Sequence, residues 1–383
     1  MAWVESYRLG NGSKRYSVRY RKPDRSGGRR SGFRTKRDAE LFASTVELSK
    51  ARGDYVDAAA GRVTVGDLGP GWLEAKRVLK PSSYRPLESA WRIYVEPVWG
   101  RRQLSSIRTS EVQAWVTKLS TGDSQARPPA APKSATTVIR AYGVLAAILD
   151  TAVKDRRITV NPARGVEDLP RKRRKAHVYL SHELVHSIAE HSKYPELVLV
   201  LAYCGLRWGE AVALRVGDVD MLGRRLHVHR NAVEVGGVIH EGTPKSHKAR
   251  AVPFPRFIGE RLEALLDGRG PEDLVFPGPD GGHLRSARVH KDNYSWFASA
   301  LDAAGAPRVT PHDLRHSAAA FAVSAGANVK AVQRMLGHAS ASMTLDVYAD
   351  LFDEDLNAVA VALDNAVSQA VAPVLRLKAT SGE

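Results

Sequence analysis

The sequence predicts a multidomain protein: a small sheet-and-helix domain first, an all-α domain second, and a mixed α+β, mainly α, domain last. Three observations predict this order. The 383 residues exceed one ordinary domain. Polar and bulky residues alternate at period two within 15–21, whereas apolar residues recur at helical spacing from about 65 to 158. Beyond residue 178 both patterns occur.

Residues 1–60 are expected to form a three-stranded sheet with one helix. Strands fit 3–9, 15–21 and 30–33, and Thr35 can cap a helix over 36–52. Residues 14–37 carry eleven basic side chains and one acid. Cations repeated along a strand suit a β-sheet reader of DNA, although an idle basic surface would give the same pattern. The candidate DNA contacts here are Arg15, Arg19, Arg21 and Arg30.

Residues 64–160 are expected to form the all-helical domain. Residues 120–135 are rich in Pro, Gly, Ser and Ala and predict a loop, and a further helix fits 138–153. A connector over 161–177 follows. Its run of adjacent cations cannot pack together, so we expect it to be exposed and extended, and able to lie along a DNA backbone. Its candidate DNA contacts are Arg171, Lys172, Arg173, Arg174 and Lys175.

The composition narrows the classes of partner that this protein can bind. The formal charge is +16, from 57 basic against 41 acidic residues, and 43% of residues are hydrophobic. A folded chain with this surplus favours an anionic polymer, because phosphate contacts release counterions. A solvated basic surface or a membrane surface would be the alternatives. The longest apolar run, 197–206, is shorter than the roughly 20 residues of a membrane span, and a lone Cys204 forms no internal disulfide. We therefore expect a soluble, intracellular protein without a membrane partner.

The last domain, 178–383, is expected to begin with a helix capped by Ser181, followed by a buried helix over 194–206. Residues 225–230 alternate as a strand. Residues 232–240, around Gly236-Gly237, and 251–254 can complete one small sheet with that strand.

Four short motifs in this domain each have an ordinary interpretation. Arg207 in GLRWGE follows a buried helix and could pair with Glu210. The segment PKSHKAR is a polar turn by itself. In HDLRH, two cationic residues three positions apart share a helix face, an arrangement that needs an anion between them. Tyr348, ten residues after the Gly-His of LGHAS, could be a half-buried helical tyrosine.

Taken together, GLRWGE, PKSHKARAVPF, HDLRH and LGHASASMTLDVY resemble, in order and spacing, the active-site set of the tyrosine recombinases, the phage integrase type. The similarity spans about 178–349. The basic N-terminal domain and the helical domain also resemble the arm-binding and core-binding domains of these integrases. The resemblance implies a site-specific recombinase that integrates, and can excise, a phage or mobile element through a 3′-phosphotyrosyl intermediate. The implied catalytic residues are Arg207, Lys245, His312, Arg315, His338 and Tyr348.

Each implied role has a physical reason. Arg207 and Arg315 can grip phosphate oxygens bidentately and stabilise the more anionic transition state. Tyr348 attacks phosphorus, but a phenol needs a base and a cationic site to do so at neutral pH. By resemblance, His312 is the proton acceptor, Lys245 the general acid for the leaving 5′ oxygen, and His338 a phosphate ligand. The covalent link conserves bond energy, so no metal, nucleotide or other cofactor is expected.

The resemblance also implies partners. These are double-stranded DNA with core-type and arm-type sites, further copies forming a homotetramer on DNA, and, as additional partners, a DNA-bending accessory protein and an excision factor. The cytoplasm of a bacterial host is the implied location. From about residue 352 a C-terminal tail is expected to dock on a neighbouring subunit and gate Tyr348.

Three alternatives remain at this point. A type IB topoisomerase shares much of this chemistry. A non-catalytic DNA-binding regulator would fit the helix-turn-helix pattern of 318–336. His227-Val228-His229 fits the pattern of metal-dependent nucleases in which two histidines on one strand face bind the ion. The last two explain fewer positions than the recombinase set does.

Overall fold

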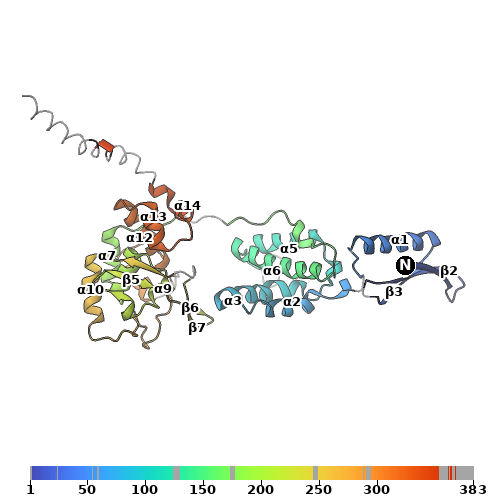
Figure 1. Ribbon diagram of the computed structural model, residues 1–383, viewed down its shortest axis with the longest axis horizontal. Coiled ribbons are helices and arrows are strands. Elements are labelled where there is room, and N and C mark those ends of the chain that lie inside the picture. The colour runs from blue at the N-terminus through green and yellow to red at the C-terminus, as the bar shows by residue number, and fades with distance from the viewer. Residues whose placement is uncertain are drawn as a thin grey trace, which may run out of the picture. The chain divides into compact units, whose positions relative to one another are not determined.

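The computed structural model describes residues 2–352, except 24, 54, 58–59, 124–129, 173–176, 245–248, 288 and 290–294, and also describes 361, 363, 364 and 367. The chain has a mixed helix-and-sheet fold with small sheets, and it divides into two compact units, Met1–Arg174 and Lys175–Glu383 (Figure 1).

The first unit opens with an antiparallel three-stranded sheet in the order β1 (Ala2–Arg8), β2 (Lys14–Arg21) and β3 (Gly27–Phe33). Helix α1 (Lys36–Arg52) packs on one face of this sheet, where Val18 and Tyr20 meet Ala39 and Val46. The hydroxyl of Thr35 accepts a hydrogen bond from the Asp38 backbone N–H, which confirms the predicted cap.

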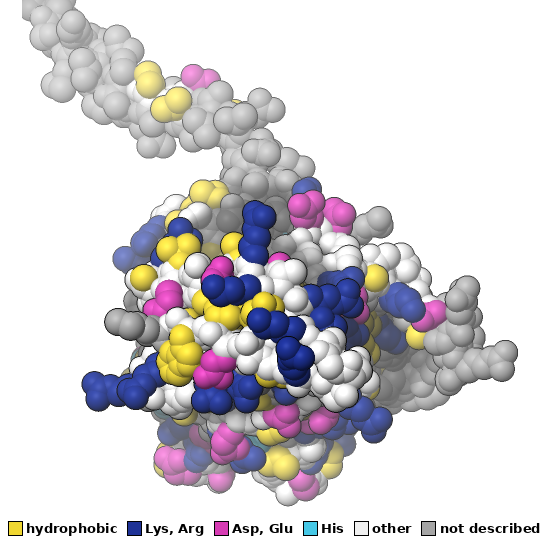
Figure 2. Space-filling model, turned by 90° about the vertical axis from the view of Figure 1, so that its right-hand side faces the viewer, with side chains coloured by type: hydrophobic (Ala, Val, Ile, Leu, Met, Phe, Trp, Pro, Cys, Tyr) yellow, Lys and Arg dark blue, Asp and Glu magenta, His cyan; other side chains and the backbone are white. Residues whose placement is uncertain are grey.

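The two faces of this sheet carry different arginines. Side chains alternate along β2, so Arg15, Arg19 and Arg21 lie on the face away from α1. Arg30 is paired in register with Val18 and therefore lies on the helix side. Its guanidinium stands 4.8 Å from the Phe42 ring centroid. The view onto this part of the chain in Figure 2 shows Lys and Arg side chains grouped around apolar ones.

The rest of the first unit is helical. Its elements are η1 (Ala60–Arg62), α2 (Val65–Glu74), α3 (Pro81–Ala90), η2 (Trp91–Val95), α4 (Glu96–Trp99), η3 (Leu104–Ser106), α5 (Thr109–Thr121), α6 (Ala135–Lys154) and η4 (Pro162–Gly165). Among the described helices, α6 alone is long and apolar enough to cross a membrane. Half of its apolar stretch is buried, with Val138, Leu145 and Leu149 fully covered, so α6 is the core helix of this part.

The second unit is built around a buried helix, α8 (Pro195–Cys204), which contacts α7, α10 and α12. Cys204 is buried, and burial raises the pKa of its thiol. The other elements are α7 (His182–Glu190), α9 (Trp208–Ala211), η5 (Val216–Asp218), β4 (Val219–Asp220), β5 (Arg225–Val228), β6 (Asn231–Val235), β7 (Val238–Gly242), β8 (Arg250–Pro253), α10 (Arg256–Leu266), α11 (Trp296–Ala303), α12 (Pro311–Ser324), α13 (Val329–Leu336) and α14 (Ala341–Phe352).

The strands of this unit differ from the prediction of one sheet. Strand β5 pairs with β4 on one side and β8 on the other, so neither of its edges is open to β6. Strands β6 and β7 therefore form a separate two-stranded sheet. His229 lies after β5 and reaches Asp218 at 3.3 Å, and both His227 and His229 are exposed. Within the described residues no group of three or more His, Cys, Asp or Glu is arranged to hold a metal ion.

Candidate active site

The site begins where α8 ends. Gly205 follows α8 with φ +64°, and a Cβ there would meet Leu336 at 2.7 Å, so this tight turn needs glycine. The turn delivers Arg207 to the start of α9. The Arg207 Nη1 donates to Glu210 Oε1 at 2.9 Å, and its backbone N–H donates to Oε2 at 2.9 Å. The ion pair anticipated between these two residues is therefore present, and it fixes the direction of the arginine.

Glu210 is also held from a second side. Arg250, on β8, donates to both carboxylate oxygens at 3.0 and 2.7 Å. Glu210 is only 1% exposed. Burial alone would raise its pKa, but the hydrogen bonds and charges of Arg250 and Arg207 outweigh burial and hold the pKa at about 2. The acid is therefore a permanent anion that orients two cations.

Helix α12 supplies the second predicted arginine. Thr310 and Asp313 form a capping box, and Pro311 occupies the first helical turn. Arg315 is 2% exposed and donates to the carbonyls of Gly205 at 2.5 Å and Leu336 at 2.6 Å. Burial and the charge of Arg207 lower its pKa to about 9, so the guanidinium remains charged at neutral pH.

The end of α13 brings in His338. Gly337 caps α13 with φ +65°, and its carbonyl accepts from Arg207 Nη2 at 3.4 Å. His338 Nδ1 lies 3.0 Å from the hydroxyl of Thr344, which is fully buried. Burial, followed by the charges of Arg315 and Arg207, lowers the pKa of His338 to about 4. The imidazole is thus neutral and oriented beside both arginines.

Tyr348 lies in α14, and its backbone departs from helical geometry at φ −124° and ψ 18°. The residue is 1% exposed and packs with Val323, Val332 and Leu336. Burial raises the pKa of its phenol to about 12, and Arg315 opposes that rise. Its ring is nearly parallel to that of His338, at 9° with centroids 6.3 Å apart.

The Tyr348 hydroxyl is hydrogen-bonded to a residue to which the sequence assigned no role. Its partner is His316 Nδ1, at 2.8 Å. His312 lies one helical turn earlier, with its ring centroid 5.2 Å from that of His316. The His312 ring keeps an exposed edge, but burial of the rest and the charge of Arg315 lower its pKa. The motif HDLRH contains both histidines, and only the fold shows which one meets the phenol.

The second unit therefore gathers five of the six predicted catalytic residues. Two arginines reach the segment Leu336-Gly337, and the implied nucleophile follows it on α14. Two guanidinium groups beside neutral imidazoles can hold one anionic phosphate. Lys245 lies outside the described residues, as do Arg173, Arg174 and Lys175. Arg171 and Lys172 are exposed in the first unit.

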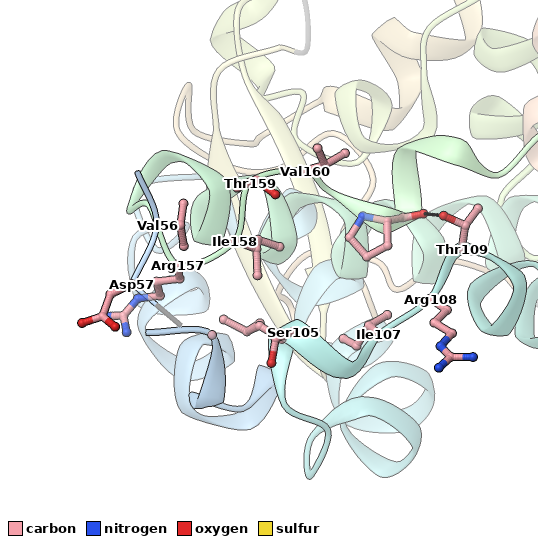
Figure 3. A pocket seen from close by; sticks show the side chains of 13 residues that line it. Val56, Asp57, Ser105, Ile107, Arg108, Thr109, Arg157, Ile158, Thr159 and Val160 are labelled. Carbon is pink, nitrogen blue, oxygen red and sulfur yellow. Dashed lines mark hydrogen bonds between the residues drawn. The ribbon is translucent and has the colours of Figure 1, made fainter. Parts of the chain in front are cut away.

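A cavity of about 550 Å³ lies in the other unit (Figure 3). Ser105, Arg108, Thr109 and Arg157 are among its lining residues, and the Thr109 hydroxyl donates to the Pro162 carbonyl at 2.9 Å. None of the predicted catalytic residues lines it.

Known proteins are similar to this chain in both sequence and fold. Residues 175–355 match the sequence model of the phage integrase family. The integrase of Mycobacterium phage L5 is 30% identical over 302 residues, covering 75% of this chain and 76% of that protein. A structure of the Tn1549 transposon integrase with transposon right end DNA aligns at TM-score 0.62 and 20% identity, covering 78% of this chain and 100% of that chain. A lambda integrase tetramer bound to a Holliday junction aligns at TM-score 0.56 and 18% identity, covering 88% and 95%.

The fold and the relatives define a tyrosine recombinase, a class of enzyme that cuts and rejoins DNA. The chain belongs to the phage integrase family and is a site-specific DNA recombinase. The resemblance drawn from the four motifs is confirmed, whereas the alternatives of a topoisomerase and a non-catalytic regulator gain no support from these relatives.

Proposed function

We propose that Tyr348 is the nucleophile of this recombinase and that Arg207, Arg315 and His338 hold the scissile phosphate. The observation that carries the proposal is that the two arginines and His338 meet at one short segment of the chain, residues 336–338. Arg315 donates to the Leu336 carbonyl, Arg207 donates to the Gly337 carbonyl, and His338 follows directly. Two fixed cations at one place suit a phosphodiester, which gains negative charge on the way to its transition state.

The cleavage step balances without an added cofactor. The Tyr348 oxygen forms a bond to phosphorus, and the bond from phosphorus to the 5′ oxygen breaks. The phenol proton passes to His312, and the leaving 5′ oxygen takes a proton from Lys245. The product is a 3′-phosphotyrosyl link and a free 5′ hydroxyl. Attack by the 5′ hydroxyl of a second strand reverses these steps and releases the enzyme.

The proposal extends to organisation and partners. We divide the chain into an arm-type DNA-binding domain over 1–60, a core-binding domain over 64–160, a basic linker over 161–177 and a catalytic domain over 178–383. A homotetramer on DNA is supported by the tetrameric lambda integrase of similar fold. Accessory DNA-bending and excision proteins, and a bacterial cytoplasmic location, belong to the same proposal.

A plasmid assay tests the function. A supercoiled plasmid carrying two attachment sites of the element should be recombined by the full chain, and Tyr348→Phe should abolish the products. A second plasmid without attachment sites is the control. Relaxation of that control plasmid at the same rate would instead indicate a topoisomerase, and recombination by Tyr348→Phe would exclude Tyr348 as the nucleophile.

A further inference from the structure

The Tyr348 hydroxyl meets a histidine that the proposed phosphate-holding set does not include. His316 follows Arg315 directly on α12, and its Nδ1 lies 2.8 Å from the Tyr348 oxygen. That distance is an ordinary one for a hydrogen bond between a hydroxyl and an imidazole nitrogen. The contact joins α12 to α14 at the reacting atom itself.

Other rings enclose this pair. The His177 ring centroid is 4.1 Å from that of His316 and 6.2 Å from that of Tyr348. The ring of His312 stands edge-on to that of His316. Val323, Val332 and Leu336 pack around the tyrosine, which is 1% exposed. The phenol is therefore covered, and a phosphate arriving from solvent does not meet its oxygen in this arrangement.

The titration of the two groups determines where the proton lies. Burial, followed by the neighbouring His177 and His312, lowers the pKa of His316 to about 4. Burial raises the pKa of Tyr348 to about 12. At neutral pH the imidazole is uncharged and the proton stays on the phenol. In the tautomer that carries its proton on Nε2, Nδ1 accepts the hydrogen bond of the phenol. A base this weak does not deprotonate an acid this weak in the resting protein.

We propose that His316 is a positioning residue that holds the Tyr348 hydroxyl in a covered, protonated resting position, from which it must be released before it can attack DNA. This inference rests on the proposed role of Tyr348 as the nucleophile. The backbone of Tyr348 already departs from the helix at φ −124° and ψ 18°, so its release does not require breaking an intact helical turn at that residue.

The chain offers a matched control. His182 Nδ1 lies 2.8 Å from the hydroxyl of Tyr203, so the same kind of histidine–tyrosine hydrogen bond exists between α7 and α8. His182→Leu and His316→Leu each remove one such bond. His316→Asn keeps an acceptor near the position of Nδ1 and serves as the conservative variant.

Nitration by tetranitromethane in the DNA-free, full-length protein is the test. The reagent attacks accessible phenols, and peptide mass spectrometry measures the rate at each of the 12 tyrosines. We expect His316→Leu to raise the Tyr348 rate about fivefold, the ratio that a hydrogen bond worth about 1 kcal/mol provides. His316→Asn should stay within twofold of wild type. His182→Leu should raise the rate at Tyr203 and leave Tyr348 unchanged.

An unchanged Tyr348 rate in His316→Leu would overturn the inference, as would His316→Asn behaving like His316→Leu. An unchanged Tyr203 rate in both His316 variants shows that the fold is intact. The proposed function fails separately, if Tyr348→Phe still forms a covalent adduct with nicked DNA, because nitration does not depend on catalysis.

Discussion

Arg250 donates from both terminal nitrogens to both carboxylate oxygens of Glu210, at 3.0 and 2.7 Å. Glu210 in turn orients Arg207, so an arginine on β8 sets the direction of the arginine that precedes α9. The Arg250 Nε also donates to the Met335 carbonyl at 3.0 Å, next to the segment that Arg315 reaches. The geometry of the proposed phosphate site therefore depends on an acid that is almost fully buried.

Replacement of Glu210 should destabilise the folded protein. Glu210→Gln leaves two cations beside a neutral amide, and breaking a buried ion pair costs about 3–5 kcal/mol. We expect a lower free energy of unfolding in urea by about that amount. Glu196→Gln, at a more exposed pair with Arg261 at 3.5 Å, is the control and should change it by less than about 1 kcal/mol. Equal losses in the two variants would refute the structural role of Glu210.

Arg315→Lys should separate charge from geometry. A lysine keeps the positive charge, but its single ammonium cannot reach the carbonyls of both Gly205 and Leu336 while facing a phosphate. We expect the rate of covalent adduct formation on nicked DNA to fall by about 10²-fold or more, as when one transition-state donor is lost. Arg261→Lys on α10 should leave the rate unchanged. A rate for Arg315→Lys within threefold of wild type would contradict the assignment.

The buried histidines predict a pH dependence of stability. Burial and the neighbouring charges lower the pKa of His338 and His316 from the ordinary 6.5 to about 4. Between these values the unfolded chain binds more protons than the folded one, so stability should fall as pH drops from 6.5 to 4. His338→Asn should show a shallower fall over this window in urea titrations at several pH values. A slope identical to that of wild type would count against the burial of His338.

Arginines on the two faces of the N-terminal sheet should have different effects when they are replaced by alanine. Arg21 lies on the face away from α1, so Arg21→Ala should reduce the salt dependence of binding to double-stranded DNA by about one unit of log–log slope. Arg30 stacks on Phe42, so Arg30→Ala should leave the slope unchanged and lower stability by about 0.5–1 kcal/mol. Equal slope changes for both variants would show that Arg30 also reaches DNA.

Much of this arrangement could be predicted from local sequence. The caps at Thr35 and Ser181 depend on neighbouring residues alone, so the helices they begin were predicted correctly. The order of the four motifs likewise identified the family, because strand-transfer chemistry requires those side chains together. The prediction of one sheet in the second unit was wrong, because β5 pairs with β4 along one edge and with the distant β8 along the other.

The missed residues depend on long-range contacts. Arg250 meets Glu210 across 40 positions and His316 meets Tyr348 across 32, and no local pattern indicates either partner. One signal was available for Arg250: it lies in the PKSHKAR segment of the recombinase set, although no role was assigned to it. For His316, the sequence places two histidines on one turn of α12, and either could bond the phenol. Only the packing of α14 shows which of them does.

The most direct test of the account uses a nicked duplex carrying an attachment site of the element, from which the leaving strand diffuses away after cleavage. The full chain should form a covalent adduct that survives denaturation, and mass spectrometry of its peptides should place the phosphate linkage on Tyr348. An adduct at another residue, or one formed undiminished by Tyr348→Phe, would contradict the account.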